Sequence, residues 1–163
     1  MVNEHSFVFI DENKGEEGTV IKEILIDDLF LEYIFKNISE DENIYNNMPT
    51  LTTNLGEGKY GLLEPTDRGF SYCGITVVNY RSMEELKKMF LQWINLLEKI
   101  NVEYVLVDEY YKKRNPSQEE IKNVEALLDS SFNKNKVLAA VYECLEIVNK
   151  FDSPRYILIC EGL

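Results

Sequence analysis

Apolar residues recur every three or four positions in four parts of the chain, a spacing that predicts four helices. These segments span about residues 27–38, 82–100, 117–128 and 135–150. Two of them begin with the S-x-x-E pattern of a capping box, formed by Ser82 with Glu85 and by Ser117 with Glu120. The last segment is apolar around most of its circumference, and we therefore expect it to be largely buried.

Shorter apolar runs before and between these segments predict β-strands. They lie at about residues 6–10, 19–26, 59–63, 70–80, 103–108 and 155–160. The first two flank an acidic stretch and predict a hairpin, and the run at 70–80, apolar on both alternating faces, predicts a central strand. Residues 39–59 are polar and predict a long loop with short structure at most.

The order of these elements predicts a single α+β domain over residues 1–163. We expect a mixed or mostly antiparallel sheet with about four helices packed largely on one face. Parallel pairing fits best around the helix at 82–100, where strand, helix and strand follow one another.

The charge of the chain is concentrated in its first third. The formal net charge is −12, and residues 1–57 contribute −10 of it, with thirteen Asp and Glu against three Lys. An acidic surface repels phosphate backbones and anionic lipids and attracts basic proteins. We therefore expect a basic protein partner, without direct binding to nucleic acid or membrane. No run of about 18 apolar residues and no secretory pattern occurs, which favours a cytoplasmic protein.

The histidine and cysteine content offers little for catalysis or metal binding. His5 is the one histidine of the chain, too few for a zinc site, and near a terminus its side chain is expected to be exposed. The cysteines form no C-x-x-C pair, which indicates free thiols, and core packing is the favoured role of Cys144, Cys160 and Cys73. The glycine-rich stretch 56–61 lacks the Walker A spacing and predicts a turn. We expect no cofactor and no metal site.

The candidate partner-binding residues are acidic clusters and one pair of tyrosines. They comprise Asp11, Glu12, Glu16, Glu17, Glu40, Asp41, Glu42, Asp108, Glu109, Tyr110 and Tyr111. The last four follow a predicted buried strand, and aromatic side chains beside carboxylates are typical of protein interfaces. The basic run 112–114 comes directly afterwards, so local neutralisation of these acids is an equal alternative.

These observations favour a binding protein over an enzyme. Small, acidic, single-domain chains without catalytic motifs are typical of immunity or antitoxin-type inhibitors of bacterial toxins, such as nucleases. Two alternatives stay open. One is a carboxylate- or metal-dependent enzyme that uses Asp108 and Glu109 with a tyrosine. The other is a structural or regulatory subunit whose acidity serves solubility. The sequence does not determine the oligomeric state.

Overall fold

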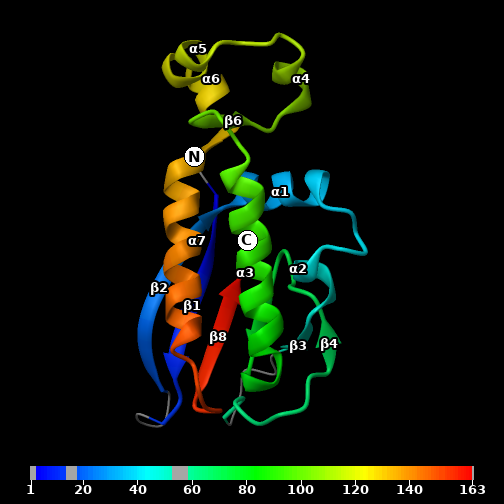
Figure 1. The fold of residues 1–163 in the computed structure, drawn as a ribbon, viewed down its shortest axis with the longest axis vertical. Coiled ribbons are helices and arrows are strands. Elements are labelled where there is room, and N and C mark those ends of the chain that lie inside the picture. The colour runs from blue at the N-terminus through cyan, green and yellow to red at the C-terminus, as the bar shows by residue number, and fades with distance from the viewer. Residues whose placement is uncertain (1–2, 14–17, 53–58, 163) are drawn as a thin grey trace.

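A computed structural model describes residues 3–13, 18–52 and 59–162. Its main feature is a six-stranded, wholly antiparallel sheet with the strand order β2-β1-β8-β5-β3-β4 (Figure 1). The strands are β1 (Glu4–Asp11), β2 (Thr19–Asp27), β3 (Pro49–Thr52), β4 (Asp67–Arg68), β5 (Ile75–Val78) and β8 (Tyr156–Glu161). The chain is therefore an α+β protein, as the sequence predicts, with the last strand at the centre of the sheet.

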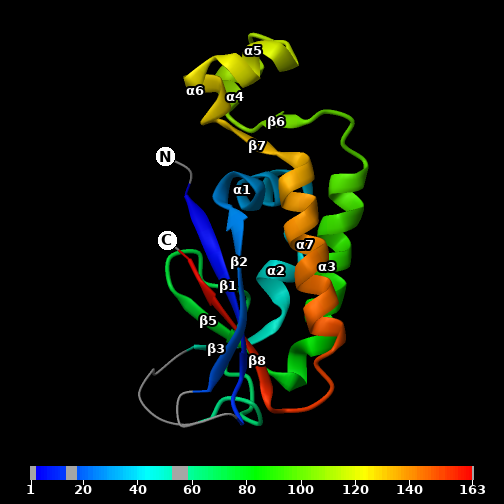
Figure 2. The same ribbon diagram turned by 90° about the vertical axis from the view of Figure 1, so that its left-hand side faces the viewer.

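The two long helices α3 (Met83–Glu98) and α7 (Lys134–Asn149) cover one face of the sheet (Figure 2). The core lies between the helices and the sheet, where Phe7 and Phe9 of β1 meet Trp93 of α3 and Val141 of α7. Burial along β1 alternates strictly, because successive side chains of a strand point to opposite faces. The prediction that the helix at 135–150 is largely buried is wrong, because α7 packs on the sheet along one stripe and Tyr142 on its outer side is 45% exposed.

The predicted hairpin of β1 and β2 is confirmed, and β2 leads directly into α1 (Asp28–Asn37). The side chain of Asp27 caps this helix by accepting a hydrogen bond from the Leu29 amide. The segment predicted as a long loop contains a short helix, α2 (Ile44–Asn47), and β3. Backbone hydrogen bonds hold these short elements, a long-range stabilisation that local sequence does not reveal.

Two predicted strands are wrong or too long. The stretch 59–63 forms a turn, and β5 covers four residues of the predicted strand at 70–80, although it does lie inside the sheet. Ser82 precedes α3 without a side-chain cap, because a 3₁₀ turn (Tyr80–Ser82) capped by Asn79 leads into the helix. The second predicted capping box, Ser117 with Glu120, is present.

A small lobe at the top of Figure 1 accounts for the other additional helices besides α2. The strands β6 (Tyr104–Leu106) and β7 (Ser131–Asn133) pair antiparallel in a sheet of their own, so the expected parallel pairing after α3 is not formed. Between them lie α4 (Glu109–Lys112), α5 (Gln118–Asn123) and α6 (Glu125–Leu128). The described residues therefore contain seven helices instead of four.

Candidate functional site

The Asp11 carboxylate, at the end of β1, is paired with an arginine of the same chain. Its side chain is buried, and its two oxygens accept hydrogen bonds from Arg155 Nε at 3.0 Å and Nη2 at 2.6 Å. The hydrogen bond to Asp11 raises the pKa of the Arg155 guanidinium. This bidentate ion pair ties β1 to the start of β8.

Glu12 is also buried, and its carboxylate forms hydrogen bonds with backbone amides of the same chain. Its carboxylate accepts hydrogen bonds from the amides of Tyr60 and Gly61, each at 2.8 Å. Gly61 is needed here, because a Cβ at this position would lie 1.9 Å from the carbonyl oxygen of Pro154. Asp11 and Glu12 therefore hold segments together, whereas Glu16 and Glu17 lie outside the described residues.

Glu40, Asp41 and Glu42, here called the acidic turn, connect α1 to α2 and are exposed. Within the described part of the chain, no ion pair or side-chain hydrogen bond joins any of the three carboxylates. Their backbone, by contrast, is firmly held. Asn47 Nδ2 donates to the Glu40 carbonyl oxygen at 2.9 Å, and Gln92 Nε2 of α3 donates to that of Glu42 at 2.7 Å.

Two surface grooves border the acidic turn. One, of about 400 Å³, lies between the end of α1 and α3, where Glu42, Leu91, Lys88 and Lys99 contribute to its wall. The other, of about 300 Å³, is lined by three acids, Asp41, Glu42 and Glu85, and by Arg68, among other residues. The acidic turn thus forms the shared rim of two hollows that side chains of another molecule could enter.

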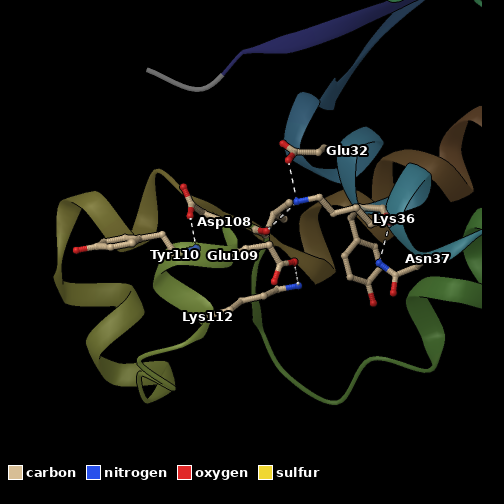
Figure 3. Close-up of polar contacts among 9 residues, drawn as sticks. Glu32, Lys36, Asn37, Asp108, Glu109, Tyr110 and Lys112 are labelled. Carbon is tan, nitrogen blue, oxygen red and sulfur yellow. Dashed lines mark hydrogen bonds and ion pairs between the residues drawn. The ribbon is translucent and has the colours of Figure 1, made fainter.

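The patch at Asp108–Tyr111 lies on α4 and is linked to α1 (Figure 3). Lys36 Nζ of α1 donates to the Val107 carbonyl oxygen at 3.3 Å and lies 3.0 Å from Glu32. The Asp108 carboxylate caps α4 through the Tyr110 amide, and Glu109 lies 3.4 Å from Lys112. The two acids are therefore satisfied locally.

An arginine of the same segment packs against the two tyrosine rings of this patch. The Arg114 guanidinium carbon lies 4.6 Å from the centre of the Tyr110 ring and 6.0 Å from that of Tyr111. Tyr110 remains 61% exposed, but the stacked arginine makes its surroundings basic. The alternative of local neutralisation, left open by the sequence, describes this patch better than an unpaired acidic surface.

The acidic clusters are not gathered into one surface. The end of β1 with Asp11 and Glu12 lies at the bottom of Figure 1, and α4 lies in the lobe at the top. The acidic turn lies on the right-hand side between them, on the chain that joins α1 to α2. We therefore treat the acidic turn as the candidate site, since its carboxylates alone are exposed and unpaired among the described residues of these clusters.

His5 is fully buried, contrary to expectation. Its Nε2 lies 2.8 Å from Oδ1 of Asp28, which also accepts a hydrogen bond from the Tyr72 hydroxyl. Burial, followed by the hydrogen bond to Asp28, raises the pKa of Tyr72, so its hydroxyl keeps the donated proton. The sequence did contain a signal for this burial: His5 lies two residues before Phe7 and four before Phe9, so strand alternation places all three on the same buried face. Its partner Asp28, 23 residues away, has no local sequence signal.

The cysteines divide into two kinds. Cys144 and Cys160 are buried in the core as predicted, whereas Cys73 is exposed, contrary to prediction. Burial, and secondarily the Glu161 carboxylate, raises the pKa of the Cys160 thiol to about 12. Burial also raises the pKa of Cys144. Both core thiols stay protonated near neutral pH.

Neither a metal-binding cluster, nor a membrane-spanning helix, nor a similar known protein is found for the described residues. Within residues 3–13, 18–52 and 59–162, no three or more His, Cys, Asp or Glu side chains are grouped closely enough to hold a metal ion. In the same ranges, no helix combines the length and apolarity required to cross a membrane. Comparison with known proteins finds no family model, no curated protein and no solved structure that matches the chain.

Proposed function

We propose that the protein binds a basic protein through the acidic turn and neutralises it, as an immunity or antitoxin-type inhibitor of a bacterial toxin. One observation supports the proposal: the carboxylates of Glu40, Asp41 and Glu42 are exposed and form no ion pair within the described residues, although Arg68, Lys88 and Lys99 line the neighbouring grooves. Acids elsewhere in the candidate clusters are buried or locally satisfied. Among the described candidate clusters, the acidic turn therefore offers the most favourable electrostatic interaction to a cationic side chain of another molecule.

The held backbone of the acidic turn favours fast and specific association. Gln92 and Asn47 fix the backbone, so binding a partner requires ordering of side chains but not of the turn itself. Unpaired surface carboxylates attract a cationic protein over a distance of roughly 10 Å at moderate ionic strength. Lysine or arginine side chains of the partner would then enter the groove lined by Asp41, Glu42 and Glu85.

The partner is best identified by its charge and then by its activity. The protein is immobilised, incubated with lysate of its native cell at low salt, and eluted with rising salt. A basic protein released only at high salt is then purified, and its enzymatic activity is measured with and without this chain. We expect the activity to fall in proportion to complex formation.

A matched pair of variants then tests the site itself. The triple variant Glu40→Gln, Asp41→Asn, Glu42→Gln removes the charges of the acidic turn. The control Glu119→Gln, Glu125→Gln, Asp129→Asn removes three exposed acids from α5, α6 and the residue after them. At about 0.5 kcal/mol for each exposed charge pair, the first variant should slow association by about tenfold at low salt.

The control should leave the rate within about twofold of the original protein, because its charges lie on the lobe. The difference between the two variants should vanish at high salt, since exposed charges are screened there. Equal effects of both variants would show that only net charge matters. Equally fast association at low and high salt would contradict electrostatic attraction altogether.

A further inference from the structure

The strand β2 forms an open edge of the main sheet. It is nine residues long and pairs with β1 on one side, and no described strand pairs with its other side. In Figure 2 it faces the viewer with no described element in front of it, and in Figure 1 it lies at the left-hand margin. Such an edge presents unpaired amides and carbonyls and can accept another strand.

The protections that usually guard an edge strand are weak in β2. It contains no proline, and its register with β1 is regular from Lys22 to Asp27. The pairing is irregular only between Phe9 and Ile10 of β1, where Ile21 has no partner. Lys22, whose charge would discourage pairing, lies on the helix side of the sheet with its Nζ 3.3 Å from Glu143 of α7.

The outer face of the sheet beside this edge is apolar and acidic. Cross-strand pairing places Leu25 beside Ser6, Glu23 beside Val8, and Val20 beside Ile10 on this face. Leu25 is 48% exposed and Val20 is 59% exposed, so both can contact another molecule. No described helix covers them, since α3 and α7 lie on the other face (Figure 2).

Two carboxylates on this outer face lack a cation within the described residues. Register places four acids of β1, β2 and β8 there, but Glu4 lies 3.8 Å from Lys136 of α7 and Asp27 caps α1, which leaves Glu23 and Glu161 without an ion pair in the described part of the chain. Lys22, the basic residue of these strands, points to the helix side. The face therefore complements a strand that carries cations between apolar residues.

We infer that β2 accepts an extended segment of a basic partner protein as a seventh strand of the sheet. Main-chain hydrogen bonds to Lys22–Ile26 would supply binding, and the side chains would supply selectivity. Opposite Leu25 the segment places an apolar residue, and opposite Glu23, two residues along, it places lysine or arginine. This surface is distinct from the acidic turn, because β2 and the α1–α2 connection lie on opposite sides of the molecule in Figure 1.

The test uses a capped, fluorescein-labelled peptide of sequence TVTKTVT, with binding followed by fluorescence anisotropy. Its comparison peptides are TVTETVT and TVTKTVT methylated on alternate backbone nitrogens. We expect TVTKTVT alone to bind and to slow hydrogen exchange of the amides of β2. Glu23→Lys should weaken its binding by about fivefold, because an attractive exposed pair becomes repulsive. Glu119→Lys, an equal charge change on α5, should leave it unchanged.

Failure of TVTKTVT to bind, or equal binding of its methylated form, would overturn the inference. Concentration-dependent self-association that Glu23→Lys abolishes would assign the edge to a second copy of this chain instead. The triple variant of the acidic turn should bind the peptide normally. Loss of peptide binding and loss of electrostatic partner binding are therefore separate results, and either proposal can fail alone.

Discussion

Glu12 provides a direct test of the division between structural and available acids. The residue is 7% exposed, and its carboxylate accepts hydrogen bonds from the amides of Tyr60 and Gly61, both at 2.8 Å. In Glu12→Gln the side chain keeps its shape but retains one accepting oxygen. The new amide group faces a backbone N–H that has lost its acceptor.

The expected cost follows from that geometry. A hydrogen bond to a charged group contributes about 1.5–3 kcal/mol, and a buried donor without a partner costs a similar amount. We expect Glu12→Gln to lower the free energy of unfolding by about 2 kcal/mol. For a chain of this length, that corresponds to a fall of about 4–8 °C in the midpoint of thermal unfolding.

The assay is urea unfolding followed by circular dichroism, with Glu40→Gln as the control. The control removes the same charge from the exposed acidic turn and should change stability by less than about 0.5 kcal/mol. Equal stability of Glu12→Gln and the original protein would refute the structural role. Unchanged stability together with weakened partner binding would return Glu12 to the binding surface.

Two further predictions concern thiol chemistry and the support of the acidic turn. At pH 8 a thiol reagent should modify Cys73 in the folded protein, whereas Cys144 and Cys160 should react only after unfolding, as mass spectrometry would show. Because the pKa of Cys160 is raised to about 12, its contribution to stability is complete below the thiol's ordinary pKa and declines as the pH rises from about 9 towards 12. Alkaline unfolding curves of Cys160→Ser should show a shallower decline, because Cys144, whose pKa is also raised by burial, still contributes, and an identical decline would contradict this assignment. Gln92→Ala leaves the net charge unchanged but removes the hydrogen-bond donor to the Glu42 carbonyl, so it should slow partner association about threefold. An unchanged association rate would mean that the acidic turn holds its shape without Gln92.

The sequence by itself determined the fold class and the longest elements. Helical spacing over 82–100 and 135–150 corresponds to α3 and α7, and alternation in the first strand corresponds to β1. These patterns are legible because each long element buries one continuous face against the same core. The Ser117 capping box was equally readable, since all of its contacts lie within four residues.

Only the tertiary structure decided which acids are available to a partner. Glu12 and Glu40 look alike in sequence, yet one binds two amides nearly fifty residues away and the other points into solvent. The same holds for His5, whose burial depends on Asp28, and for the open side of β2, which depends on strand order. Charge is a property of each residue, but its exposure and pairing arise from contacts between distant segments, and local sequence does not encode those contacts.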